Sequence, residues 1–200
     1  MAACTMTDRS PPSGTGANGG GLEALIARAG HAGEGLPPVE RWEPDFCGDI
    51  DMVIRADGTW VHEGSPIGRK RLVRLFSTVL RRDDDGETYL VTPVEKLRIT
   101  VEDAPFLAVE MEASENPQVL TFRTNVGDVV EAGPDHPLRF EREEGTDGVK
   151  PYLLVRGRLE ALVTRAVMYD LMELAEEENG RLVVRSNGAS FAVEPQKADG

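Results

Sequence analysis

The sharpest cluster of chemistry-bearing residues in this sequence is a basic stretch that begins after Gly68. Three consecutive cations follow at positions 69–71, and Arg74 comes one helical turn after them. The first turn of a helix usually carries acidic residues, because its unpaired N–H groups have partial positive charge. Cations there favour a bound phosphate or carboxylate, held by Arg69 and Arg74. The alternative is a solvated basic face that answers acidic neighbours such as residues 83–85.

A second candidate is a pair of carboxylates, Asp49 and Asp51, in a stretch with the composition of a strand. Alternate side chains of a strand point to the same side. The pair could therefore hold a divalent cation or share a proton, as in a metal-dependent hydrolase. The alternative is that both aspartates pair with arginines or cap a loop, because no third ligand stands nearby in the sequence.

A third candidate is the turn that contains Thr124, Asn125 and Asp128. The backbone N–H groups of such a turn, together with the threonine and asparagine side chains, can recognise the polar groups of a nucleotide-like ligand. Asx-type turns of the same sequence also form without any ligand. Serine-hydrolase, Walker and dinucleotide-binding motifs are absent from the sequence, so we expect no catalytic residue and no cofactor.

Charge and hydropathy narrow the set of partners. The 200 residues include 22 Lys and Arg against 35 Asp and Glu, which leaves a net charge of −13. This balance opposes binding to nucleic acid polymers or anionic membranes, although a local basic patch can still bind one small anion. No apolar run approaches the roughly 20 residues that span a bilayer, and the N-terminus does not resemble a signal peptide. A cytoplasmic location is therefore expected, and the oligomeric state is left open.

The elements that must position these residues follow from periodicity and turn signals. Asp57 and Gly58 predict a hairpin turn. Apolar residues at helical spacing predict helices over about 69–82 and about 159–178. The domains expected from this pattern are a flexible tail at residues 1–21, a short helix (22–29) with a linker to residue 38, an N-terminal α+β domain at 39–105, a C-terminal α+β domain at 106–195 and a frayed end at 196–200.

The spacing of the predicted elements also indicates an internal repeat. A strand at 59–62 leads through a helix to a pair of strands, and a strand at 152–155 does the same. This favours an α+β fold of two similar small sub-domains, each a curved antiparallel sheet with one main helix. The alternative is that units of this kind recur by chance.

Several longer motifs carry a family resemblance. They are WEP at 42–44, FCGDIDM at 46–52, LVRLFSTVLRR at 72–82, YLVTPVEK at 89–96, VEDAPF at 101–106, LTFRTNVGD at 120–128 and GPDHPLR at 133–139. With these motifs the chain closely resembles the bacterial domain-of-unknown-function family 1285. The resemblance implies a duplicated core with a C-terminal part superficially like pleckstrin-homology folds. It also implies a nucleotide-like ligand between the two halves and a role in signalling, which is analogy rather than chemistry.

The leading hypothesis is therefore a non-catalytic protein that binds a small phosphate-bearing ligand at the interface of its two domains. The residues expected to contact this ligand are Gly68, Arg69, Arg74, Thr124, Asn125 and Asp128. Two alternatives stay open. One is a metal-dependent hydrolase that uses Asp49 and Asp51, and the other is a protein–protein interaction module.

Overall fold

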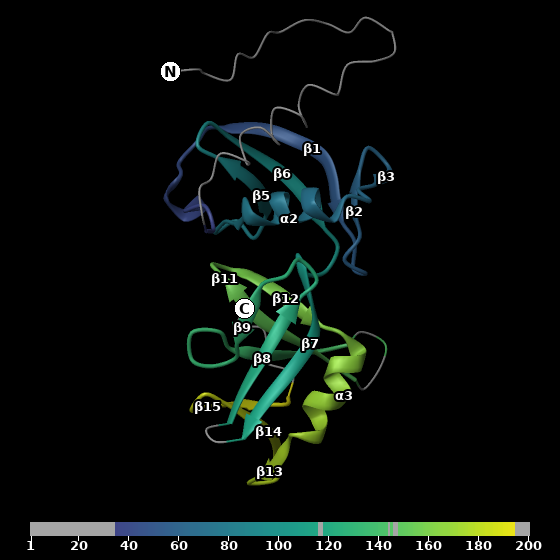
Figure 1. Cartoon of the computed structure of the whole chain (residues 1–200), viewed down its shortest axis with the longest axis vertical. Coiled ribbons are helices and arrows are strands. Elements are labelled where there is room, and N and C mark those ends of the chain that lie inside the picture. Colours follow the sequence, from purple (N-terminus) through teal and green to yellow (C-terminus); the bar gives the residue numbers. More distant parts are fainter. Residues whose placement is uncertain (1–34, 116–117, 144, 146–147, 195–200) are drawn as a thin grey trace, which may run out of the picture. The chain divides into compact units, whose positions relative to one another are not determined.

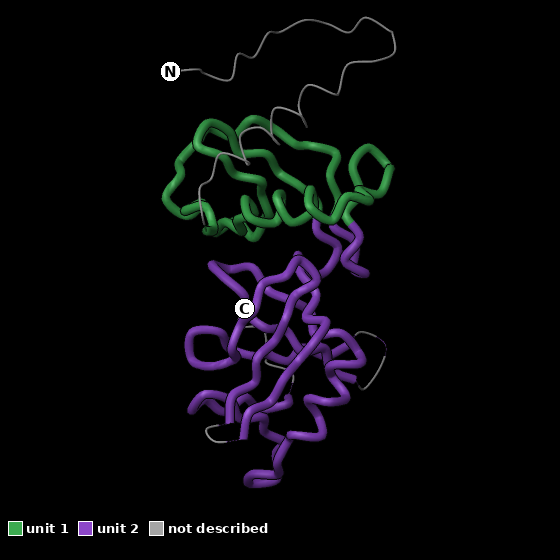
Figure 2. The backbone as a smooth tube through the Cα atoms, in the orientation of Figure 1, with its two compact units in different colours: residues 1–53, 60–100 green, residues 54–59, 101–200 purple. Residues whose placement is uncertain are grey.

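The computed structural model describes residues 35–115, 118–143, 145 and 148–194 (Figure 1). The predicted tails at 1–21 and 196–200 and the predicted helix at 22–29 lie outside the described residues. The rest divides into two compact units (Figure 2). Unit 1 runs to Val53 and continues over Trp60–Thr100, and unit 2 combines Ile54–Thr59 with the residues from Val101 onward.

Unit 1 is built on one six-stranded sheet with the strand order β3-β2-β1-β6-β5-β4. Two groups of three consecutive strands therefore meet where β1 lies beside β6. The helix α2 connects the two groups. The elements are η1 (Val39–Arg41), β1 (Phe46–Ile54), β2 (Trp60–His62), β3 (Ser65–Pro66), α2 (Lys70–Thr78), β4 (Leu80–Arg82), β5 (Thr88–Thr92) and β6 (Glu95–Val101).

Unit 2 has a second six-stranded sheet, with the order β10-β11-β12-β7-β8-β9, and a separate three-stranded sheet, β13-β14-β15. The strands of the large sheet are β7 (Phe106–Glu115), β8 (Gln118–Thr124), β9 (Val129–Glu131), β10 (Leu138–Arg142), β11 (Val149–Arg156) and β12 (Leu159–Val163). The remaining elements are α3 (Arg165–Glu173), β13 (Glu176–Glu178), β14 (Arg181–Ser186) and β15 (Ala189–Ala192). Figure 1 shows α3 running beside β7, which it contacts.

The two large sheets share one topology, which confirms an α+β fold with duplicated halves. In each sheet the first strand of the first group pairs with the last strand of the second group. The central pair in unit 2, β12 with β7, is parallel, so this sheet is mixed rather than purely antiparallel. The repeat lies in a different register from the predicted one. Helix α2 precedes β4, whereas α3 follows β12, so the two helices are not equivalent.

Both predicted helices extend too far. The first ends at Thr78, and the residues after Val79 form β4, which pairs with β5. The second was expected over 159–178 but is a strand, a nine-residue helix and another short strand. Leu159, Ala161 and Val163 alternate as buried residues, and their strand pairs with β11 and β7. Period-two burial between two neighbouring strands outweighs the helical spacing of the same apolar residues.

Each unit has its own apolar core. In unit 1, Trp60 stacks on Phe76 of α2 at 6.3 Å between ring centroids, above the fully buried Met52 and Leu90. In unit 2 the largest fully buried side chains are those of Phe106, Phe122, Phe140, Leu120 and Leu153. Each such side chain contributes roughly 1.5–3 kcal/mol by leaving water. No helix within the described ranges is long and apolar enough to cross a membrane.

Candidate functional site

The start of α2 carries the basic cluster that the sequence singles out. Arg69 is the N-cap residue, in an extended conformation, and its side chain makes no capping hydrogen bond. The first turn holds no acidic residue. Arg69, Lys70, Arg71 and Arg74 are all exposed. Among the residues that the structure describes, none of these four side chains forms an ion pair, so their positive charge is balanced by no neighbouring carboxylate.

Two of the acidic residues that were expected to answer this cluster are engaged elsewhere. Asp83 accepts hydrogen bonds from Arg81 at 2.6 Å and from Lys96 at 3.0 Å, and Asp85 accepts one from the Tyr89 hydroxyl at 2.6 Å. Burial by itself would raise the pKa of Asp83, but the hydrogen bonds from Arg81 and Lys96 outweigh burial and lower it. These contacts run within the β4–β6 region and leave the cations of α2 uncompensated.

The tyrosines provide a test of these contacts. The hydrogen bond to Asp85, together with burial, raises the pKa of Tyr89 from 10.0 to about 12. Burial and a hydrogen bond to Asp103 also raise the pKa of Tyr152. We expect absorbance titration of the phenolates to show that two of the three tyrosines ionise well above pH 10. The Tyr89→Phe variant should lose the transition near pH 12.

The sign of the linked stability effect follows from the direction of this shift. Folded Tyr89 keeps its proton up to about pH 12, whereas the unfolded chain loses it near pH 10.0. The contribution of Tyr89 to stability is therefore present below pH 10.0 and is lost as the pH rises to about 12. An Asp85→Asn variant should return the Tyr89 transition toward its ordinary value. A Tyr89 transition that stays near pH 12 in this variant would contradict the Asp85 contact.

The predicted turn after β8 is an internally bonded structure. The Thr124 hydroxyl accepts a hydrogen bond from the backbone N–H of Asp128 at 2.9 Å. The Asp128 carboxylate pairs with Arg156 at 2.6 Å, and that guanidinium lies over the ring of Phe106. Thr124 is buried and Asp128 is half-buried. The turn therefore uses both side chains to hold itself against β11 and β7.

Asn125 ties the same turn to the start of β7. Its side-chain carbonyl accepts a hydrogen bond from the N–H of Leu107 at 3.1 Å, and its own backbone N–H donates to the Leu107 carbonyl at 2.9 Å. The predicted Asp57–Gly58 turn is present, with a φ of 80° at Gly58. A Cβ on Gly58 would lie 2.8 Å from Leu107 and 2.9 Å from Asn125, so glycine permits the close approach.

The carboxylate pair does not form a metal site. Both oxygens of Asp49 accept hydrogen bonds from Arg98, at 2.8 and 3.0 Å. This is the arginine pairing that the sequence left open as the alternative. In the described ranges, no group of three or more His, Cys, Asp or Glu side chains could hold a metal ion. Asp49 and Asp51 therefore have no third ligand there.

The predicted ligand contacts fall into two groups. Gly68, Arg69 and Arg74 come together at the start of α2 in unit 1. Thr124, Asn125 and Asp128 come together in the turn between β8 and β9 in unit 2. The role of either group in ligand binding stays a prediction.

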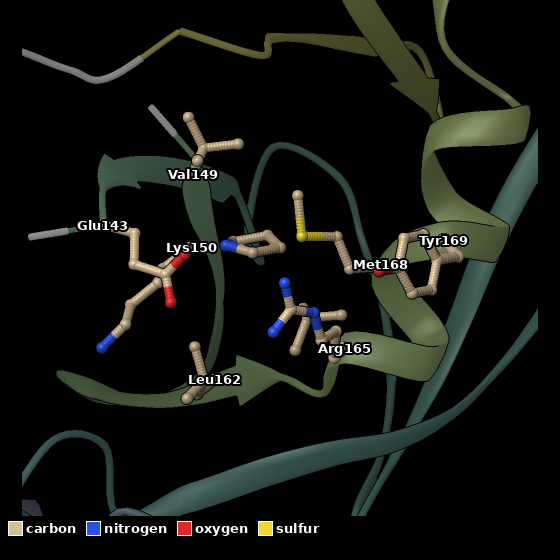
Figure 3. Close-up of a pocket in the computed structure, with 10 residues that line it drawn as sticks. Glu143, Val149, Lys150, Leu162, Arg165, Met168 and Tyr169 are labelled. Atoms are coloured by element: carbon tan, nitrogen blue, oxygen red, sulfur yellow. The ribbon is translucent and has the colours of Figure 1, made fainter. Parts of the chain in front are cut away.

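Unit 2 also contains a cavity that sequence reasoning missed. It has a volume of about 320 Å³ and lies between α3 and the strands β11 and β12 (Figure 3). Val149, Pro151, Leu162, Val163 and Met168 supply apolar lining. The predicted helix over 159–178 concealed this site, because Leu162 and Val163 belong to a strand and only Met168 belongs to the helix.

Charged residues stand at the rim of this cavity. Arg165, the first residue of α3, hydrogen-bonds Tyr169, and this contact, together with the nearby charge of Glu143, raises the pKa of Arg165. Lys150 extends away from Arg165 (Figure 3), and its ammonium lies 2.8 Å from Asp103. Arg165 is thus the cation whose side chain borders the cavity without an aspartate bound to it.

The comparisons with known proteins agree along the whole described chain. Residues 37–104 match the N-terminal domain of a domain of unknown function, DUF1285, and residues 105–193 match the C-terminal domain of the same family. A crystal structure of a DUF1285 family protein from Silicibacter pomeroyi DSS-3 is 47% identical, with a TM-score of 0.78, and the match covers 84% of this chain and 93% of that one. A DUF1285 family protein from Shewanella baltica OS155 is 28% identical, with a TM-score of 0.50, over 62% of this chain and 91% of that one. No match was found among curated proteins.

Proposed function

Because this chain belongs to the DUF1285 family, which is described only as a domain of unknown function, we propose a function from its own residues. The protein is a non-catalytic binding protein for a small phosphate-bearing, nucleotide-like ligand, and Arg69 and Arg74 contact the charged group of that ligand. A cytoplasmic location and a place in signalling are parts of the same proposal.

The observation that supports this proposal is the uncompensated charge at the start of α2. Four exposed cations lie within six residues, although the chain has 13 more acidic than basic residues. In such a chain most cations find carboxylate partners, as Arg81 and Arg98 do. A phosphate would balance the cluster through charge-assisted hydrogen bonds, which are stronger than neutral ones. The hydrolase alternative has less support, because Arg98 occupies the Asp49 carboxylate.

The test is a single substitution measured in two conditions. In the ligand-free protein, Arg69→Ala should change the free energy of unfolding by less than about 0.5 kcal/mol, as exposed side chains usually do. In the presence of a nucleotide found by calorimetric screening of a nucleotide panel, the same variant should lose roughly 1.5–3 kcal/mol of binding. That loss corresponds to an increase of the dissociation constant by about tenfold or more.

Arg82→Ala is the matched control, since Arg82 is an exposed arginine of unit 1 whose guanidinium donates to the Gly86 carbonyl. It should leave the nucleotide affinity unchanged. The proposal fails if no nucleotide in the panel binds at millimolar concentration. The residue assignment alone fails if a nucleotide binds but Arg69→Ala, Arg74→Ala and Arg82→Ala have equal affinities.

A further inference from the structure

The cavity of unit 2 has the size and lining of a small-molecule site. Its volume of about 320 Å³ lies at the small end of the range of roughly 300–1,000 Å³ in which ligand pockets fall. The walls are apolar on both sides. Leu162 comes from β12, Val149 from β11 and Met168 from α3. A molecule that fits here must have a compact apolar part, because an unpaired polar group against these walls would lose its hydrogen bonds with water.

The rim of the cavity carries both signs of charge. Arg165 borders it from α3, and Glu143 borders it from the segment between β10 and β11, facing α3 across the cavity (Figure 3). The second cation at the rim, Lys150, is committed to Asp103. A ligand seated between the walls therefore meets one guanidinium and one carboxylate. This pair suits a ligand that carries an anionic and a cationic group on a small frame.

We propose that this cavity binds a free apolar α-amino acid. The carboxylate of the ligand contacts Arg165, its ammonium contacts Glu143, and its side chain packs against Met168 and Leu162. A dianionic phosphate fits less well, because Glu143 would repel it and the apolar walls leave its oxygens without donors. The site belongs to unit 2, whereas the cations of α2 belong to unit 1, so the two proposals stand or fall separately.

Isothermal calorimetry of the full chain with L-leucine and L-phenylalanine tests this inference. Two analogues remove one charge each: isocaproate lacks the amine of leucine, and isoamylamine lacks its carboxylate. Leucine or phenylalanine should bind, and both analogues should bind at least about tenfold more weakly than leucine, because each leaves one rim charge without its partner. Absence of binding by both amino acids, or equal binding by leucine and isocaproate, overturns the proposal.

Substitutions then place the ligand in the cavity. Arg165→Gln should weaken amino-acid binding at least about tenfold, and Glu143→Gln should remove the preference for leucine over isocaproate. Arg165 is exposed at the first position of its helix, so the variant should fold, which circular dichroism checks. Arg123→Gln, which alters an exposed arginine of unit 2 paired with Glu110, should bind like the parent protein. Unchanged affinity in Arg165→Gln would overturn the assignment of this cavity.

Discussion

Replacing Arg81 by alanine is expected to destabilise unit 1 by about 3–5 kcal/mol, the usual cost of removing one partner of a buried ion pair. Arg81 is 8% exposed. One of its nitrogens donates to the backbone carbonyls of Val39 and Trp42, at 2.9 and 2.7 Å, and the guanidinium also pairs with Asp83. The substitution would leave two carbonyls without these donors and would weaken the attachment of η1 to β4.

Urea unfolding followed by tryptophan fluorescence measures this effect in the right unit, because both tryptophans of the chain, Trp42 and Trp60, belong to unit 1. The control is Arg98→Ala, which removes an exposed ion pair with Asp49. Exposed pairs contribute about 0–1 kcal/mol, so the control should unfold close to the parent protein. Equal losses in the two variants would show that the buried contacts of Arg81 carry no special weight.

The second large effect is expected at Ser186, which joins the small sheet of unit 2 to the large one. Its side chain is almost fully buried. The hydroxyl accepts a hydrogen bond from the N–H of Leu120 at 2.8 Å and donates one to the carbonyl of Ala132 at 2.7 Å. Ser186→Ala would leave both backbone groups buried without a partner. Each such group costs roughly 1–3 kcal/mol, so unit 2 should lose several kcal/mol.

Hydrogen exchange at the Leu120 amide reports this loss directly, because that N–H is the donor to Ser186. Its exchange should accelerate strongly in Ser186→Ala. Ser190→Ala is the matched control, since Ser190 is an exposed serine on the next strand, β15, and its replacement should leave Leu120 protected. Unchanged exchange at Leu120 in the Ser186 variant would contradict the role of the hydroxyl.

The sequence by itself determined the features that depend on local conformation. The Asp57–Gly58 turn was predictable because glycine adopts positive φ without steric cost. The strand over Thr88–Thr92 was predicted with its observed bounds. The family was also predictable, because its motifs are long and run through both halves of the chain. The basic start of α2 was visible for the same reason, since four cations close together in sequence stay together on any helix.

Only the tertiary structure decided the features that depend on which segments become neighbours. The residues around Leu159–Val163 fit a helix and a strand alike until β7 and β11 provide hydrogen-bond partners on both sides. The charges of 83–85 could have paired with α2, but pairing of β4, β5 and β6 places Arg81, Tyr89 and Lys96 beside them instead. The cavity of unit 2 joins a strand end, a second strand and a helix. Its rim charges are separated in sequence and meet only when α3 docks beside the sheet, because side-chain contacts between distant segments are set by packing and not by local spacing.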